Sequence, residues 1–250
     1  APDTINGLNL YAYCGNNPVM NVDPNGTDWW NPFSWDWGAI GRFVGGVTLV
    51  LVGLMVMGAS LRPALSVIPG MGFVTQAGFS IMMYGGFMVG SVFDSDIKSD
   101  MDSIHWNPFN SDESLVTGSE KVSFYKGMPS VWINKESGRP GGFLGIWLKG
   151  SVDANTIRHE WGHGIQQGLF GWARFLFLVG LPSWRKWGGN HWRGDKNYYR
   201  RPWEVMADWF GGVTSDRAYY KSATAKDRRI AIWYTIVSWL LGPAAFLFLI

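Results

Sequence analysis

Residues 157–168 read Ile-Arg-His-Glu-Trp-Gly-His-Gly-Ile-Gln-Gln-Gly, so that His159, Glu160 and His163 form an HExxH pattern. Positions i and i+4 of a helix share one face, and both imidazoles can therefore reach a single metal ion. Glu160 would lie close enough to that ion to accept a proton from its water. The chain has only four His and five Glu in 250 residues, so chance seldom produces this pattern. The stretch predicts a metal-binding helix, with zinc as the metal.

A third protein ligand is expected, because catalytic zinc sites combine three side chains with one open position. The extended pattern HExxHxxGxxH is excluded, since Gln166 and Leu169 stand where its glycine and third histidine would be. A better candidate is Pro-Trp-Glu-Val-Met-Ala-Asp, where Pro202 suits the start of a helix that carries Glu204 and Asp208 on one face. We expect Glu204 to be the third ligand and Asp208 to orient a histidine through its other ring nitrogen, or to substitute as the ligand.

The composition favours contact with lipid or another very apolar partner. Only 16% of the residues are charged, whereas the chain contains 33 Gly and 16 Trp. The net charge of +2 gives no reason to expect a nucleic-acid partner. Cys14 is the single cysteine, which excludes an internal disulfide and a cysteine-rich zinc finger.

Three apolar runs flank the central part of the chain. Residues 43–59 and 64–93 predict a glycine-rich helical hairpin that turns at Arg62-Pro63, and a Trp-rich segment precedes it. A third run, 230–250, carries no charge and follows a basic flank, which predicts an apolar C-terminal helix. Each run is compatible with a membrane span and with a buried core helix, because periodicity cannot separate these cases when every face is apolar.

The section between these runs, residues 94–229, has the pattern of an α+β unit. It opens with spaced aspartates that indicate a solvated linker rather than a calcium loop. Short strands, separated by turns that contain Gly and Pro, are expected at 121–125, 130–134 and 143–148. The metal-binding helix should follow, with Asp153 or Asn155 as its cap. We therefore predict an α+β fold in which a small antiparallel sheet accompanies zinc-binding helices, with residues 143–148 as an edge for an extended peptide substrate.

Two parts of the sequence are similar to known families. Residues 7–26, GLNLYAYCGNNPVMNVDPNG, resemble the end of the core in Rhs/YD-repeat proteins, in which a variable C-terminal toxin follows a β-shell. The HExxH pattern followed by Glu-x-x-x-Asp is similar to the gluzincin metallopeptidases, and this resemblance implies that Glu204 binds zinc while Asp208 lies behind a ligand. Residues 105–213 also resemble the metallopeptidase modules at the ends of Rhs-type proteins. That similarity is carried by Asn-Pro-Phe-Asn at 107–110, Phe-Tyr-Lys-Gly at 124–127, Arg-His-Glu-Trp-Gly-His at 158–163, Gly-Leu-Pro-Ser at 180–183 and Tyr-Tyr-Arg-Arg-Pro-Trp-Glu at 198–204.

The chain is then expected to have four parts. These are the end of an Rhs core at 1–26, the Trp-rich segment and apolar hairpin at 27–93, a metallopeptidase-like domain at 94–229 and an apolar helix at 230–250. The resemblance implies a module that is secreted or delivered at the cell surface. Its expected partners are a protein or peptide substrate, the upstream Rhs shell and an immunity protein, with a membrane as the partner of the apolar segments.

Peptide-bond hydrolysis is the reaction expected of such a site. Glu160 would take the proton of the attacking water and pass it to the leaving amine. His191 and Tyr198, together with Tyr199, are candidates for the extra donor that a developing oxyanion needs. An intramembrane protease is disfavoured, because its later Asp ligand lies on a spanning helix and Asp208 lies in no apolar run of that length. The rival hypothesis is a membrane-active protein, pore-forming or anchoring, whose metal site is structural.

Overall fold

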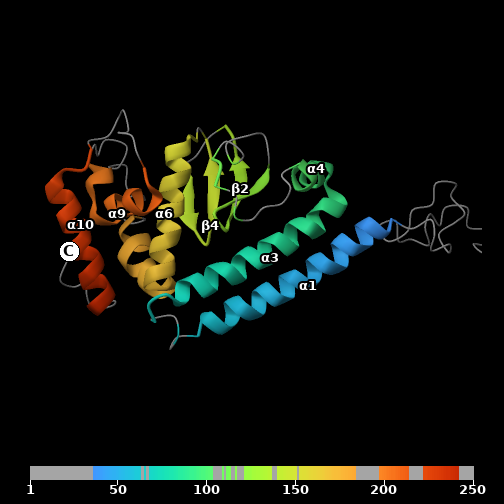
Figure 1. The fold of residues 1–250 in the computed structure, drawn as a ribbon, viewed down its shortest axis with the longest axis horizontal. Coiled ribbons are helices and arrows are strands. Elements are labelled where there is room, and N and C mark those ends of the chain that lie inside the picture. Colours follow the sequence, from blue (N-terminus) through green and yellow to red (C-terminus); the bar gives the residue numbers. More distant parts are fainter. Residues whose placement is uncertain are drawn as a thin grey trace, which may run out of the picture.

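The computed structural model describes residues 36–62, 65, 68–103, 109, 111–113, 116, 121–136, 140–150, 152–183, 197–213 and 222–241. This part of the chain has the predicted α+β fold, in which one small sheet lies among helices (Figure 1). In chain order the elements are α1 (Trp37–Ser60), α3 (Met71–Phe93), α4 (Ser95–Ser103), β1 (Val122–Tyr125), β2 (Met128–Asn134), β3 (Gly141–Phe143), β4 (Gly145–Lys149), α6 (Ala154–Phe170), α7 (Trp172–Phe175), the π-helical turn η3 (Leu176–Gly180), the 3₁₀ turn η5 (Tyr198–Arg200), α9 (Pro202–Gly211) and α10 (Ala225–Leu241). The predictions for the Rhs-like residues 1–26 and for His191 lie outside the described residues.

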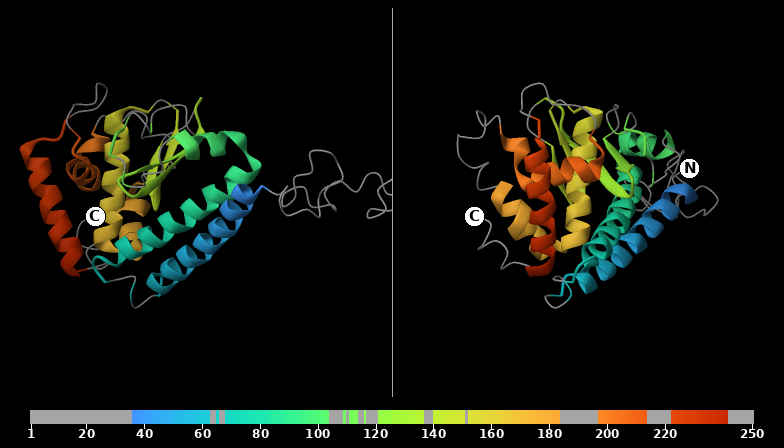
Figure 2. Two further views of the ribbon diagram at one scale, coloured as in Figure 1. Left: turned by 45° about the vertical axis from the view of Figure 1, so that its right-hand side comes forward. Right: turned by 60° about the vertical axis from the view of Figure 1, so that its left-hand side comes forward.

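The expected hairpin is formed by α1 and α3, which run side by side along one side of the molecule (Figures 1 and 2). The first helix begins at Trp37, earlier than the apolar run itself, because the carboxylate of Asp36 caps it by accepting the N–H of Ala39 at 2.9 Å. The second begins only at Met71, two residues after Pro69, and ends at Phe93. Of the spaced aspartates that follow, Asp94 caps the end of α3 and the other three lie in the short helix α4.

Glycines allow the two helices of the hairpin to touch backbone to backbone. A Cβ at Gly53 would lie 2.5 Å from the carbonyl oxygen of Gly78, and a Cβ at Gly85 would lie 2.4 Å from that of Gly46. Both distances are shorter than any side chain tolerates, so these contacts require glycine. The close approach expected from the Gly-rich sequence is therefore present along most of the hairpin.

The sheet has the strand order β1-β2-β4-β3 and is mixed, whereas the sequence predicted an antiparallel sheet. The outer pairs are antiparallel, but β2 and β4 are parallel, with Val131 opposite Trp147. The reason is β3, which was expected as part of a turn and instead returns the chain along the outer edge of the sheet. Leu144, with φ of 59°, then reverses the chain into β4, so that β4 enters between β3 and β2 in the direction of β2. The outer strands are consequently β1 and β3, and most of the expected edge, residues 143–148, lies inside the sheet.

Helix α6 is the central element, with the sheet on one side and α9 on the other (Figure 1). It begins where expected, since Asp153 caps it by accepting the N–H of Thr156 at 2.7 Å. Ile157 on its first turn is fully buried in the core that the helix shares with the sheet. At the sheet edge, a Cβ at Gly142 would lie 2.2 Å from the carbonyl oxygen of Glu160, so β3 packs directly against α6.

The hairpin also packs against α6, through α3. A Cβ at Gly72 would lie 2.0 Å from the carbonyl oxygen of Gln167, which places the start of α3 against the last turns of α6. The buried side chain of Gln76 donates to the carbonyl oxygen of Gly164 at 2.6 Å. Helix α3 therefore lies between α1 and the elements that carry the candidate site.

The C-terminal apolar helix is α10, which begins at Ala225 within the basic flank and packs on α9 and η3 (Figure 2). Its buried Tyr234 donates a hydrogen bond to the carbonyl oxygen of Leu178 at 2.5 Å. Phe170 and Met206 belong to the same buried cluster. The apolar segment that follows α6 therefore packs against α9 and α10.

Candidate metal centre

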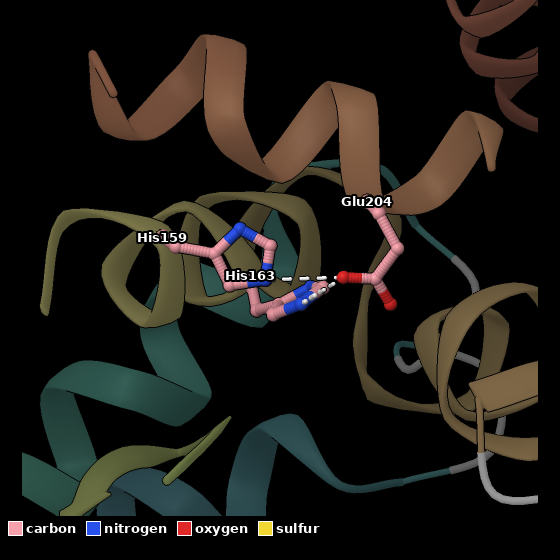
Figure 3. Close-up of side chains that lie close together, drawn as sticks. All are labelled: His159, His163 and Glu204. Atoms are coloured by element: carbon pink, nitrogen blue, oxygen red, sulfur yellow. Dashed lines mark ion pairs between the residues drawn. The ribbon is translucent and has the colours of Figure 1, made fainter. Parts of the chain in front are cut away.

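Two buried histidines and one buried glutamate meet where α6 crosses α9 (Figure 3). Both imidazoles project from α6 toward the side chain of Glu204 on α9. Oε2 of Glu204 lies 3.1 Å from Nε2 of His159 and 3.6 Å from Nε2 of His163. One donor atom from each residue falls within 4.8 Å of the others. The structure thus brings together the three side chains that the sequence named as ligands.

Two glycines make this helix crossing close enough for the side chains to meet. Gly162 lies between the two histidines, and a Cβ there would be 2.0 Å from the carbonyl oxygen of Ala207 on α9. Gly211 on α9 has the reciprocal relation, because its Cβ would be 2.0 Å from the carbonyl oxygen of Arg158. Pro202 at the first turn and Gly212 after the last, with φ of 68°, set the ends of α9.

Glu204 is ionised in this setting. Burial alone would raise its pKa, but hydrogen bonds from His159 and His163 outweigh burial and hold the pKa of Glu204 well below 4.5. Its other oxygen, Oε1, accepts a hydrogen bond from Oγ of Ser183 at 3.3 Å. The carboxylate is therefore an anionic donor that presents Oε2 to both histidines.

The outer nitrogen of each imidazole contacts an oxygen acceptor. Nδ1 of His159 lies 2.6 Å from Oδ1 of Asp208, which is the orienting contact expected for this residue. Nδ1 of His163 lies 2.7 Å from Oε1 of Gln166, a contact that the sequence analysis did not foresee. The position of Gln166, three residues after His163 on the same helix face, was the available signal. Asp208 faces the outer nitrogen rather than the three donor atoms, so Glu204 fits the ligand position better than Asp208 does.

This donor set fits a metal ion. Two imidazole nitrogens and one carboxylate oxygen converge, and each ring has its outer nitrogen engaged, as in protein metal sites where a second acceptor fixes the ring. Among the described residues this is the one group of His, Cys, Asp and Glu side chains placed closely enough to hold a metal ion. The chain can therefore hold a metal between α6 and α9.

Three of the remaining candidate residues lie on the described elements of the site. Glu160 is buried on α6, next to His159. Tyr198 lies in η5, and burial together with the nearby carboxylate of Glu204 raises the pKa of Tyr198 far above its ordinary value. The phenol is therefore a neutral donor at physiological pH. The ring of Tyr199 stands edge-on to His159, with 5.5 Å between ring centroids.

Aromatic side chains connect the edge strand to the site. The half-exposed ring of Phe143, at the end of β3, stacks on Phe175 with 6.0 Å between centroids. Phe175 in turn lies edge-on to His163, with 6.4 Å between centroids. The end of the outer strand β3 is therefore connected to the candidate ligand His163 through two aromatic rings.

The comparisons with known proteins found no match: no protein-family model, curated protein or solved structure matches the chain. Fold and site together define an α+β protein with a buried His-His-Glu group on two crossing helices. The resemblance to gluzincins and to Rhs-type toxins remains a prediction from the motifs.

Proposed function

We propose that the chain is a zinc-dependent peptide-bond hydrolase that acts as a toxin module. The observation that carries the proposal is the convergence of Glu204 on the two histidines of the HExxH pattern. A structural metal site needs no carboxylate beside its ligands, whereas HExxH supplies one in Glu160. The pattern Glu-x-x-x-Asp on α9 supports the same class, since Asp208 faces the outer nitrogen of His159.

Zinc is the metal that this donor set favours. Three ligands drawn from imidazole and carboxylate groups, with one position left open, are typical of catalytic zinc. When bound, zinc supplies Lewis-acid chemistry, which polarises a peptide carbonyl and brings the pKa of a water to about 7. His159, His163 and Glu204 would hold it.

The side chains around the ligands supply the proton transfers. Glu160 accepts a proton from the water that attacks the peptide carbonyl and then gives it to the leaving amine as the C–N bond breaks. Tyr198 is a neutral donor beside Glu204 and can hydrogen-bond the developing oxyanion. An extended peptide can pair with β3, because β3 is an outer strand of the sheet and its Gly142 lies next to Glu160.

The toxin role is supported by the sequence alone. Residues 7–26 resemble the end of an Rhs core, and such a core precedes a C-terminal toxin. Secretion or delivery at the cell surface, an upstream shell and an immunity protein belong to the same proposal.

The decisive experiment replaces Glu160 by glutamine, which keeps the shape of the side chain but cannot accept the proton. Peptide cleavage and toxicity of Glu160→Gln should fall by about 10²- to 10⁴-fold, while the protein still binds one zinc ion. Glu136→Gln is the matched control, because Glu136 is an exposed carboxylate in the turn after β2. Full toxicity of Glu160→Gln with zinc bound would refute the peptidase, and wild-type protein without stoichiometric zinc would refute the ligand set as well.

A second candidate, a membrane-active protein with a structural metal site, is favoured by the arrangement of α1. Its large apolar side chains face outward, and Met55 is 70% exposed. Its buried positions are small: Ala39, Gly46, Gly53 and Ser60. The hydroxyl of Thr48 donates back to the carbonyl oxygen of Val44 at 2.9 Å, so it needs no water. A helix of a water-soluble protein buries its large apolar side chains, whereas α1 exposes them and buries small residues. This arrangement suits contact with lipid.

The length of α1 agrees with this second candidate. Its 24 residues make it, within the described ranges, the one helix long and apolar enough to cross a membrane. At 1.5 Å per residue it is about 36 Å long, against about 30 Å for the hydrocarbon layer of a bilayer. The sequence contains no Asp, Glu, Lys or Arg between Arg42 and Arg62.

The two candidates give opposite results for charge on the outer face of α1. Leu51→Lys and Met55→Lys should abolish binding to lipid vesicles and toxicity if the helix itself is the active element. If the metal centre is the active element, peptide cleavage by these variants should equal that of wild type. Ile133→Lys is the control, because Ile133 is an exposed apolar residue on the sheet. Vesicle flotation and peptide cleavage measured on the same preparations separate the candidates.

A further inference from the structure

Gln166 joins the two helices that carry the metal centre. It is fully buried, at 0% exposure, and lies one turn after His163 on the same face of α6. Its Oε1 lies 2.7 Å from Nδ1 of His163, and its Nε2 donates to the carbonyl oxygen of Trp203 at 2.6 Å. Trp203 immediately precedes Glu204 on α9. One side chain therefore contacts a histidine of the donor group and the backbone beside the glutamate.

The carbonyl group of Trp203 determines which way the amide of Gln166 points. A carbonyl oxygen only accepts hydrogen bonds, so the amide NH₂ group must face Trp203 and the amide oxygen must face His163. The amide oxygen also only accepts, so Nδ1 of His163 must carry the proton in that contact. Nε2 is then the nitrogen that faces Glu204 and the other donors, and it would bind a metal in place of the proton that it shares with Glu204.

The two histidines are held by chemically different groups. His159 contacts the carboxylate of Asp208, while His163 contacts the neutral amide of Gln166. An amide fixes the ring without placing a further negative charge beside Glu204. Because it is also a donor, the amide holds α9 through Trp203, which a carboxylate at this position could not do.

We propose that Gln166 is a positioning residue of the metal centre. It holds His163 by Nδ1, so that Nε2 is the nitrogen that faces a metal, and it sets the separation of α6 and α9 at Glu204. The inference rests on the metal-binding part of the proposed function and adds a residue that neither HExxH nor Glu-x-x-x-Asp contains.

The first test measures zinc affinity of the full chain by competition with a chromophoric chelator. Gln166→Met keeps the volume of the side chain and removes both contacts, so it should weaken zinc binding by about 10- to 100-fold. Gln167→Met is the matched control, because Gln167 is equally buried and adjacent but accepts the N–H of Leu144 at 2.9 Å instead of contacting a ligand. Its zinc affinity should equal that of wild type.

The second test uses cobalt(II) as the probe and observes the exchangeable ring N–H protons by NMR. Wild type should show two shifted and exchange-protected signals, one for each histidine beside the metal. Gln166→Met should lose protection of one signal, and loss of fold stability alone would not select a single ring. Gln166→Glu keeps an acceptor for His163 but no donor for Trp203, so it should retain both protected signals and bind the metal more weakly. This variant replaces Gln166→Met in the test if the Met variant does not fold.

Each outcome bears on a different statement. Equal zinc affinities for Gln166→Met and Gln167→Met, or two protected signals in Gln166→Met, would overturn the inference and leave the proposed function standing. Metal binding that depends on Gln166 in a protein that cleaves no peptide would overturn the hydrolase alone. A wild-type chain that binds neither zinc nor cobalt would overturn both.

Discussion

Replacing Gly162 by alanine should force apart the two helices that carry the metal centre. Gly162 lies between the two histidines, at the point where α6 crosses α9. A Cβ at this position would lie 2.0 Å from the carbonyl oxygen of Ala207 and 2.7 Å from its carbonyl carbon. Both atoms belong to the backbone, so no change of rotamer can relieve the contact. One of the helices must move.

The size of that movement follows from the same distance. Contacts of a Cβ essentially never fall below 3.0 Å, so the helices must separate by at least about 1 Å at this point. Metal–ligand distances tolerate only about 0.2 Å, and Glu204 would then lose its bonding distance to an ion held by the histidines. Overpacking of this kind costs about 1–3 kcal/mol of folding free energy, and each kcal/mol lowers Tm by about 2–4 °C in a chain of this size.

Calorimetry and zinc titration of the purified variant measure both effects. Gly86→Ala in α3 is the control, because no atom lies within 4 Å of a Cβ built there. That variant should bind zinc normally and be as stable as wild type or more stable by up to about 1 kcal/mol, since alanine favours helix over glycine. A Gly162→Ala protein with wild-type Tm and wild-type zinc affinity would refute the close crossing of α6 and α9.

Three further substitutions test other contacts. Glu204→Gln removes the anionic ligand and should weaken zinc binding more than Asp208→Asn, for which an orienting role predicts a loss of about 10- to 100-fold in the same titration. Glu113→Gln tests an ion pair that supports α6: the hydrogen bond from Arg158 outweighs burial and lowers the pKa of Glu113 from 4.5 to about 2. Because the folded-state pKa is lowered, the stabilisation is complete above pH 4.5 and is lost as the pH falls toward 2. Tm of the variant should therefore fall less than that of wild type between about pH 5 and 2, and parallel profiles would contradict this.

The elements with strong local signals were predictable. The cap at Asp153, the spacing of the histidines and the position of Pro202 act within one or two helical turns, so the sequence alone locates α6 and α9. The face shared by Glu204 and Asp208 follows from helix geometry in the same way. The contact between this face and the histidines joins residues that are distant in the sequence. Only the resemblance to a known motif predicted it.

The features that were missed depend on contacts between distant segments. Strand β3 has only three residues, two of them Gly, and such a sequence predicts a turn. Its pairing with β4 depends on the reversal at Leu144, which no local pattern indicates. In the sequence Gln166 only excludes a longer histidine motif, because its contact with Trp203 joins residues that are 37 positions apart.

The position of α3 has a consequence for how the molecule unfolds. Gln76 of the hairpin donates to the carbonyl oxygen of Gly164, the residue that follows His163. Separation of the hairpin would break this buried hydrogen bond and expose one side of α6 to water. Two regions that differ sharply in composition therefore share one cooperative unit, and the order of the metal-binding helix depends on a segment that contributes no ligand.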